Sequence, residues 1–470
     1  MIPNAKENVI PNPSAPRGQR IRDRDHAPAI PTRFESELFD RLITAAAPDY
    51  SGTHCVVSFA GRIDADRLVR AVRLTLDAEP ILACRWIEHW FRPSWRRRDD
   101  LDHTEFCEVR ESSNVRADVD GFRELPPDVP LRVLLLRGET DLLCIKLDHR
   151  AGDGGAMKDY AYLLADIYNR LCNDPYYVPV PNVDGRRGMQ QLRDRFSFRE
   201  KLRIFWHGLT AIRRLTRTVG TWKFPRSEND ALEGAYLWLD AARVRAIRGF
   251  AFRQRATMSQ VLVAALYRAI CHARPQGSTR NLPITVAADL RRYLSPKNAA
   301  KLCNLNGVVV VSIDPRSGES LDGVVKQVRD QMVQAQRSKY LGLPLSGFLV
   351  EGLPIIRHMV GLIPYGCLKR VLRRVRNPRI LEREITRRVI FTDGGELRLD
   401  RLTFAGTGIS DAFLTAGVLK EMTRSLRIAA GAPLGMTVSE FQGSLTLSLG
   451  YGPRAFIAEL FEEMMRILPA

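Results

Sequence analysis

Residues 141–155 read DLLCIKLDHRAGDGG, and the architecture of the chain is best predicted from this stretch. An apolar run typical of a strand leads into His149 and then into a tight turn that holds Asp153 and two glycines. Residues 157–172 follow with apolar side chains at helical spacing, which predicts a helix directly after the turn. A neutral imidazole at a strand end can take a proton from a hydroxyl or amine. We therefore interpret His149 as a candidate general base. An ordinary strand-end turn remains the alternative for so short a pattern.

Two further features extend this unit. Residues 130–136, PLRVLLL, predict a partner strand for the apolar run, joined to it by a short turn. Gly154 and Gly155 carry no Cβ, so they permit close approach of backbone to a substrate or a positive φ.

Together these segments resemble the condensation-domain and chloramphenicol acetyltransferase-like superfamily of acyltransferases. That group includes alcohol acetyltransferases, wax ester synthases and the condensation domains of peptide synthetases. Its signature is His-His-x-x-x-Asp-Gly. Here Asp148 replaces the first histidine, and His149 matches the second, which is the family's catalytic one.

A second landmark lies at residues 282–293, LPITVAADLRRY, where a predicted strand runs into a polar turn. In the family, an arginine of this region pairs with the aspartate of the histidine motif. The resemblance thus implies an ion pair between Asp153 and Arg291, with Arg292 as the partner if the register differs by one residue. The pair would be structural and would hold the turn that aims His149, because a buried carboxylate without its partner is strongly destabilising.

The C-terminal part resembles the family less completely. Residues 433–451 alternate as two strands around a glycine turn, and a predicted helix at 455–467 closes the chain, as in the family. Residues 402–411, LTFAGTGISD, stand where many relatives carry Ser-Asn-x-Gly. That pair is absent, so no residue role is carried over from it.

The resemblance covers roughly residue 34 to the C-terminus. It implies an α/β fold (an α+β sandwich) of two chloramphenicol-acetyltransferase-like lobes, with mixed sheets and an active-site channel between them. We expect a disordered leader at 1–33, an N-terminal lobe at 34–185, a basic amphipathic connector at 186–229 and a C-terminal lobe at 230–470.

Composition narrows the cellular setting. The 470 residues are 45% hydrophobic, which suits a soluble chain of two ordinary domains. The eight cysteines form no Cys-x-x-Cys pair, so neither zinc nor a redox dithiol is indicated. Free thiols and the lack of an apolar leader predict a cytoplasmic protein.

The charge balance is 71 − 53 = +18, which attracts polyanions, anionic membranes or phosphate-rich ligands such as CoA. High arginine use can also reflect genomic bias alone. Residues 193–226 interleave arginines with aromatic and apolar side chains, a pattern typical of an interfacial helix, and 369–388 are again arginine-rich. An ordinary packed helix with a solvated arginine face explains the same pattern. Nucleic-acid binding rests on charge alone, since no recognition module accompanies it.

By resemblance, the predicted reaction is acyl transfer from a thioester to an alcohol or amine, with His149 as general base. Gly154 and Asp148 would lie beside the reactants. Neither a metal nor a bound cofactor is needed, because acyl-CoA, or the phosphopantetheine of an acyl carrier protein, is the co-substrate. The acceptor would be a small molecule or lipid of lipid or secondary metabolism, with peripheral contact to the inner membrane surface. A carrier-protein-dependent condensation enzyme and a non-catalytic binder of acylated ligands or membranes remain alternatives.

Overall fold

The computed structural model describes the larger part of the chain: residues 29–46, 52–112, 119, 122, 129–183, 187–218, 220, 222, 232–273, 280–294, 302–314, 320–375, 389–417 and 434–470. Most of the expected leader lies outside the described residues. So do the ends of both arginine-rich stretches, at 223–226 and 376–388.

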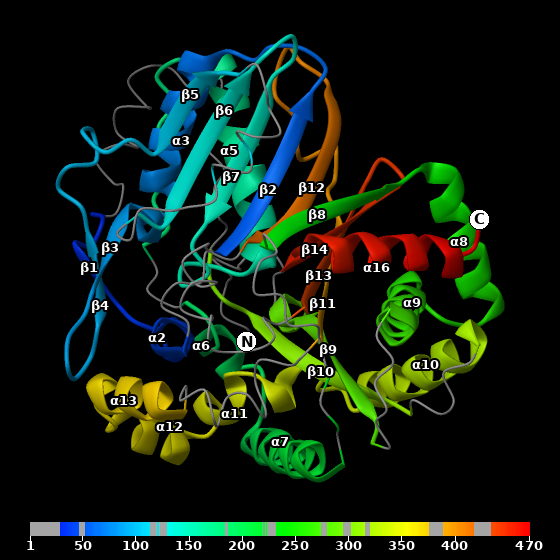
Figure 1. Ribbon diagram of the computed structural model, residues 1–470. Coiled ribbons are helices and arrows are strands. Elements are labelled where there is room, and N and C mark those ends of the chain that lie inside the picture. The colour runs from blue at the N-terminus through cyan, green and yellow to red at the C-terminus, as the bar shows by residue number, and fades with distance from the viewer. Residues whose placement is uncertain are drawn as a thin grey trace, which may run out of the picture.

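The first lobe is built on a five-stranded mixed sheet (Figure 1). Its strands, in spatial order, are β12 (Ile409–Gly417), β2 (Gly52–Phe59), β7 (Leu142–Leu147), β6 (Leu131–Arg137) and β5 (Cys107–Glu111). All neighbours pair antiparallel except β5 and β6. One face is covered by α3 (Ala65–Ala78) and α5 (Gly154–Asn173). On the other face, Val56, Leu134 and Cys144 belong to a second buried apolar cluster. Because the central strands are buried on both faces, the run before His149 is apolar without a break.

The second lobe holds a six-stranded mixed sheet and four helices. The strands, in spatial order, are β10 (Asn306–Ile313), β9 (Leu282–Asp289), β11 (Val389–Glu396), β13 (Leu434–Phe441), β14 (Ser444–Pro453) and β8 (Leu232–Leu239). The helices are α8 (Ala241–Arg253), α9 (Met258–Ala273), α10 (Leu321–Arg337) and α16 (Arg454–Ile467). The strongly apolar α9 is buried between the sheet and its neighbouring helices. The expected α/β architecture of two lobes with mixed sheets is confirmed.

Strand β12 joins the lobes. It comes from the C-terminal part of the chain, yet it pairs along its length with β2 of the first sheet. Leu414 N also donates to Ser439 Oγ of β13 at 3.0 Å, and the Thr415 hydroxyl contacts that of Ser448 on β14. The segment expected to form the second lobe thus contributes a strand to the first. A cavity of about 490 Å³ lies at this junction, lined by residues of β8, β12 and β14.

The remaining elements lie below the two sheets in the view of Figure 1 and at its lower left. A small sheet contains β1 (Arg33–Glu35), β4 (Ser94–Arg97) and β3 (Cys84–Ile87). The 3₁₀ helices among the described residues are η1 (Pro80–Ala83), η2 (Leu290–Tyr293) and η5 (Leu343–Leu345). The α-helices here are α2 (Leu38–Ala46), α6 (Gln190–Arg193), α7 (Phe198–Thr218), α11 (Phe348–Glu351), α12 (Pro354–Gly361) and α13 (Tyr365–Val375). Within the described residues, no helix has the length and apolar character needed to cross a membrane.

Candidate active site

His149 lies in the short loop that connects β7 to α5. The loop closes as a tight turn, because Ala151 N donates to Asp148 O at 2.9 Å. Asp153 then caps α5, its side chain accepting a hydrogen bond from Ala156 N at 2.9 Å. A buried strand at one end and a capped helix at the other fix the backbone of the loop. The sequence-predicted unit of strand, histidine turn and helix is present.

Asp153 forms the ion pair that the resemblance implies, with Arg291 rather than Arg292. Arg291 Nη2 lies 3.0 Å from Asp153 Oδ1, and Leu305 N donates to Oδ2 at 2.7 Å. Burial raises the pKa of Asp153, but the Arg291 guanidinium and two backbone amides outweigh it and hold the pKa below its ordinary value. Arg291 also donates to Cys303 O at 2.9 Å, so it ties the loop to the segment before β10.

The two glycines of the motif have different surroundings. A Cβ at Gly155 would lie 2.5 Å from Nη1 of Arg291, so only glycine leaves room for the guanidinium. A Cβ at Gly154 would meet nothing within 4 Å. Neither residue has a positive φ. A positive φ is therefore not the reason for glycine at these two positions. Gly155 thus accommodates Arg291, and Gly154 borders open space.

Asn304 orients the imidazole of His149. Nδ1 of His149 lies 3.0 Å from Oδ1 of Asn304, and Nδ2 of Asn304 donates to the backbone carbonyl of His149 at 2.8 Å. Because the amide nitrogen is committed to that carbonyl, Oδ1 is the acceptor, and we assign the imidazole proton to Nδ1. In the neutral ring the basic lone pair is then on Nε2. This is the tautomer that a general base acting through Nε2 requires.

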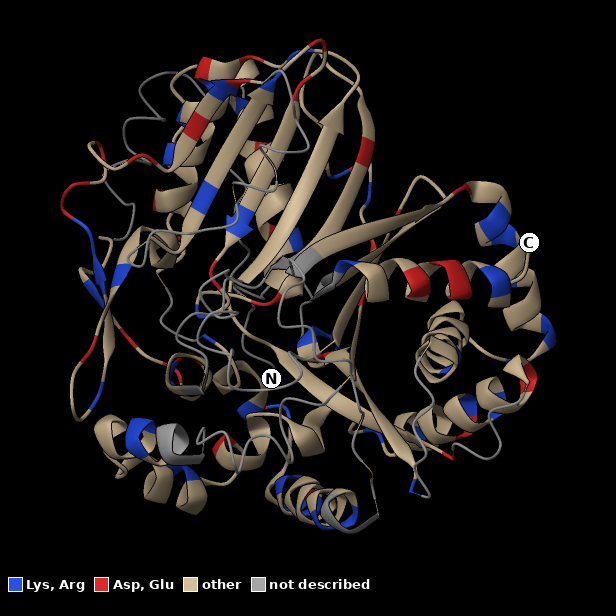
Figure 2. Ribbon diagram, viewed as in Figure 1, with Lys and Arg blue, Asp and Glu red and all other residues tan. Residues whose placement is uncertain are grey.

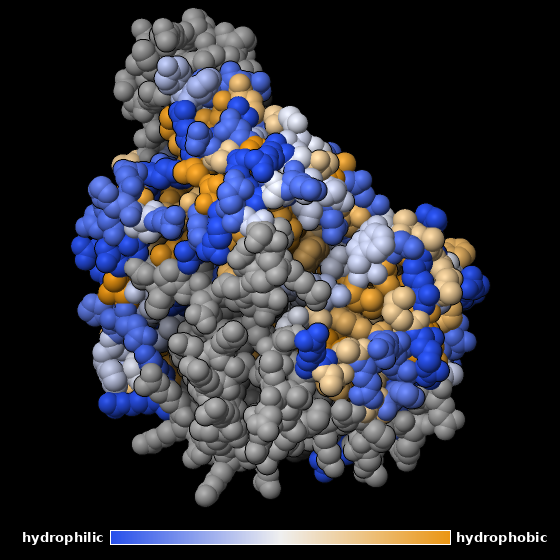
Figure 3. Space-filling view, turned by 45° about the horizontal axis from the view of Figure 1, so that its top comes forward, coloured by the Kyte–Doolittle hydropathy of each residue, from blue (hydrophilic) through white to orange (hydrophobic). Residues whose placement is uncertain are grey.

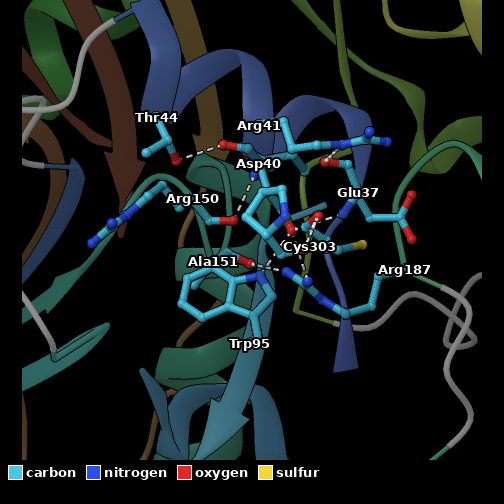
Figure 4. Close-up of polar contacts among 12 residues, drawn as sticks. Glu37, Asp40, Arg41, Thr44, Trp95, Arg150, Ala151, Arg187 and Cys303 are labelled. Carbon is cyan, nitrogen blue, oxygen red and sulfur yellow. Dashed lines mark hydrogen bonds and ion pairs between the residues drawn. The ribbon is translucent and has the colours of Figure 1, made fainter. Parts of the chain in front are cut away.

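A buried arginine supports the loop from its other side (Figure 4). Arg187 Nη2 donates to Ala151 O at 3.2 Å, and Nη1 donates to Asp40 Oδ2 of α2 at 3.1 Å. The same carboxylate oxygen accepts from Trp95 Nε1 at 2.9 Å. Arg187 and Asp40 are nearly inaccessible to solvent, so each supplies the counter-charge that the other needs. The histidine loop is therefore clamped between two buried ion pairs, Asp153–Arg291 and Asp40–Arg187.

Two buried carboxyl groups adjoin this clamp. Burial, together with the nearby Glu351 and Asp40 carboxylates, raises the pKa of Glu37 to about 8. Burial likewise raises the pKa of Glu351 to about 7. Gln190 of α6 donates to Glu37 Oε1 at 2.6 Å. Since Asp40 already neutralises Arg187, a protonated Glu37 avoids an excess of negative charge beneath the loop.

Asp148 occupies the position of the family's first histidine. Its oxygens accept from Arg150 Nε at 3.0 and 2.9 Å, and Oδ1 also accepts from Arg150 N at 2.7 Å. The Arg150 guanidinium lies over the Trp95 ring, 5.9 Å from its centre. Asp148 is buried, and this network favours a structural role for it over the predicted contact with substrate.

Sequence reasoning missed Asn304, Arg187 and Asp40. Strand β10 begins at Asn306, which pairs with Asp289 of β9. A signal for Asn304 was present, because it stands directly before the strand that follows the second landmark. Arg187 carries no such signal in a chain with 71 lysines and arginines.

The structure also shows the state of the cysteines and of the possible metal ligands among the described residues. All eight cysteines are free thiols. Burial raises the pKa of the nearby Cys303 to about 11, so this thiol stays protonated near neutral pH. Among the described residues, no group of three or more His, Cys, Asp or Glu side chains is arranged to hold a metal ion.

No family model matches the sequence, and no curated protein matches it either. Solved structures match over nearly the whole chain. The polyketide synthase associated protein 5 from Mycobacterium tuberculosis is 17% identical, with 94% of this chain and 98% of that one covered and a TM-score of 0.61. The first condensation domain of the CDA synthetase is also 17% identical, with 93% and 95% covered and a TM-score of 0.62.

A trichothecene 15-O-acetyltransferase from Fusarium sporotrichioides is 10% identical, with 93% and 95% covered and a TM-score of 0.65. The chain has the condensation-domain fold. Identities this low establish the fold that the resemblance implies, and they carry no residue's role.

Proposed function

We propose that this condensation-fold chain is an acyltransferase that moves an acyl group from a thioester to an alcohol or amine, with His149 as general base. The hydrogen bond between His149 Nδ1 and Asn304 is the observation that carries the proposal. It leaves the basic lone pair on Nε2, at the end of a buried strand. Condensation and acetyltransferase enzymes are among the solved structures with this fold.

The proposed reaction needs one proton carrier. His149 Nε2 takes the proton of the acceptor hydroxyl or amine while its oxygen or nitrogen attacks the thioester carbonyl. The tetrahedral intermediate collapses, the carbon–sulfur bond breaks, and the leaving thiolate takes the proton back from the imidazolium. No acyl-enzyme is required, and burial, which raises the pKa of Cys303 to about 11, disfavours this thiol as a nucleophile. The two clamping ion pairs fix the loop that carries His149, and a fixed base supports the proposal.

For the donor we favour acyl-CoA, with an acyl carrier protein's phosphopantetheine as the alternative. The net charge of +18 supports a phosphate-rich donor of either kind. Two of the structural neighbours, a synthetase condensation domain and a polyketide synthase associated protein, keep the carrier-bound donor open. The proposed acceptor is a small molecule or a lipid.

The test is thiol release from a panel of acyl-CoAs and a carrier-loaded donor, with pooled alcohols and amines. His149→Ala should lower the rate on the order of 10²–10⁴-fold, because it removes the base. His103→Ala, which truncates an exposed histidine of the same lobe, is the matched control and should leave the rate unchanged. Equal turnover in wild type and His149→Ala would refute the assignment. Tight binding of acyl thioester without turnover would instead identify a non-catalytic binding protein.

A further inference from the structure

Helix α7 carries an apolar stripe that faces solvent. Its five members recur three or four residues apart and therefore share one side of the helix. Their exposed fractions are 63% for Phe198, 39% for Leu202, 58% for Trp206, 38% for Leu209 and 42% for Ile212.

The packed side of α7 is a different one. Ile204 is fully buried, and a Cβ at Gly208 would lie 2.4 Å from the side chain of Leu349 on α11. A helix that is attached through one apolar face does not need a second one for its own stability. The solvent-facing stripe is thus available for a partner.

A second apolar group lies on α12 and beside it. The helix has no buried residue, and it exposes Ile355 by 73% and Met359 by 63%. Leu362 and Ile363 follow with 57% and 45% exposed. The tip of the β3–β4 hairpin adds Trp90 and Phe91, each about half exposed. Gly366 N donates to Trp90 O at 2.8 Å, and Tyr365 N donates to Phe91 O at 3.1 Å, so the tip is fixed against α13.

The elements that carry these two groups lie along one side of the molecule. Figure 1 shows α7, α11, α12 and α13 together along its lower edge, and α11 contacts both α7 and α12. We call this side the α7–α12 surface; it consists of Trp90, Phe91, Phe198, Leu202, Trp206, Leu209, Ile212, Ile355, Met359, Leu362 and Ile363. On the face shown in Figure 3, by contrast, apolar and hydrophilic side chains are mixed over both lobes.

Basic residues lie on the same helices as the exposed apolar ones, and Figure 2 marks them in blue along α7. On α7 the exposed arginines are Arg199, Arg203, Arg213 and Arg214. Arg357 is exposed on α12, and the Arg370 guanidinium of α13 lies over the Trp90 ring, 4.7 Å from its centre. Nearby acids are engaged locally: Glu88 pairs with Lys369 at 2.6 Å, and Glu200 accepts from Ser197 at the start of α7.

We propose that the α7–α12 surface docks the protein on an anionic lipid membrane. Trp, Phe and Leu along one helix side, flanked by arginines, is the pattern of a helix that lies in the plane of a bilayer interface. The apolar side chains would enter the boundary between headgroups and acyl chains, and the arginines would meet lipid phosphates. A second copy of this chain is a poorer occupant, because its own α7–α12 surface would bring arginines against arginines.

The lipid assignment also agrees with the space behind α7. Trp206 lines a cavity of about 540 Å³ between α7, β10 and α10, together with Val308 and Val310. The lining of this cavity combines apolar side chains with polar ones such as Gln331 and Ser338, so it could receive an amphipathic lipid beside the stripe. The membrane proposal does not depend on the chemistry of His149. Membrane docking and the proposed acyl transfer can therefore be refuted independently.

The test is flotation of the full chain with vesicles of phosphatidylcholine alone or mixed with phosphatidylserine, at physiological salt. Wild type should float with the mixed vesicles. The double variants Leu202→Gln/Trp206→Gln and Ile355→Gln/Met359→Gln should each weaken partitioning about tenfold or more, because two apolar side chains no longer insert. Phe252→Gln is the control. It changes a side chain that is 85% exposed on α8 of the second lobe, and this variant should float as wild type does.

Three outcomes would overturn the proposal. The first is that wild type is not recovered with phosphatidylserine vesicles at all. The stripe variants could float as well as Phe252→Gln, in which case charge alone attracts the protein. Sedimentation could show that the same variants dissociate a dimer, which would make this surface a protein interface. His149→Ala should float normally, and circular dichroism should show all variants folded.

Discussion

The proton on Nδ1 of His149 depends on a single amide. The Asn304 side chain accepts from Nδ1 of the His149 ring at 3.0 Å and donates to the His149 backbone carbonyl at 2.8 Å. An amide held at both ends cannot rotate without losing one hydrogen bond, so the imidazole is oriented before any reactant binds. Positioning of this kind lowers the barrier because the geometry is set in advance.

Asn304→Ala should therefore lower kcat on the order of 10- to 100-fold, with little change in KM. The general base remains, but its tautomer and orientation are no longer fixed. Steady-state kinetics on the best thioester donor would measure the changes in kcat and KM separately. Asn306→Ala, two residues further on in β10, is the matched control. A change in KM alone would show that Asn304 binds substrate and does not position His149.

The neighbouring glycines provide a second residue-scale test. Gly155→Ala should destabilise the protein by about 1–3 kcal/mol, because its Cβ would collide with the Arg291 guanidinium that Asp153 holds in place. Gly154→Ala has open space for its Cβ and should leave stability nearly unchanged while it lowers turnover. Denaturant unfolding and thiol release separate the two effects. Equal stability of both variants would contradict the proposed accommodation of Arg291.

At the scale of elements, α2 and the segment before α6 support the loop between β7 and α5. The Asp40–Arg187 pair connects α2 to the segment before α6 and reaches Ala151 of the loop. Glu37 and Glu351 add carboxyl groups whose pKa values are raised by burial, Glu37 to about 8. The stability of this packing should therefore depend on pH.

The direction follows from proton binding. The ordinary pKa of Glu37 is 4.5 and the folded-state pKa is about 8, so between these values the folded protein holds more protons than the unfolded one. Stability should fall as pH rises through this window, by at most about 1.4 kcal/mol per pH unit for this group. Glu37→Gln keeps the side chain neutral at every pH, so the stability of this variant should fall less steeply as pH rises. Thermal unfolding from pH 5 to 8 would measure it, with the exposed Glu462→Gln of α16 as control. A slope unchanged by Glu37→Gln would show that this carboxyl does not titrate there.

At the scale of the whole molecule, β12 makes the lobes interdependent. It pairs with β2 over its length, and it also hydrogen-bonds to β13 and β14 of the other sheet. Arg291, which directly follows β9 of the second lobe, holds the histidine turn of the first lobe through Asp153. The candidate site therefore exists only when both lobes are assembled. The α7–α12 surface lies along one side of this assembly, where it could present the whole protein to a lipid phase.

The sequence by itself determined the histidine unit, because a buried strand, a glycine-bearing turn and a helical period are all local patterns. It also determined the two-lobed fold and the Asp153–Arg291 pair through a motif shared with a known family. The tertiary structure alone decided the rest. Asn304 reaches His149 from 155 positions away, and Arg187 reaches Ala151 from 36. Such contacts depend on which strands become neighbours, and a single asparagine or arginine has no periodicity that reveals its partner. The amphipathic character of α7 was readable from its sequence, but packing against η5 and α11 decided which apolar face is buried and which is left to solvent.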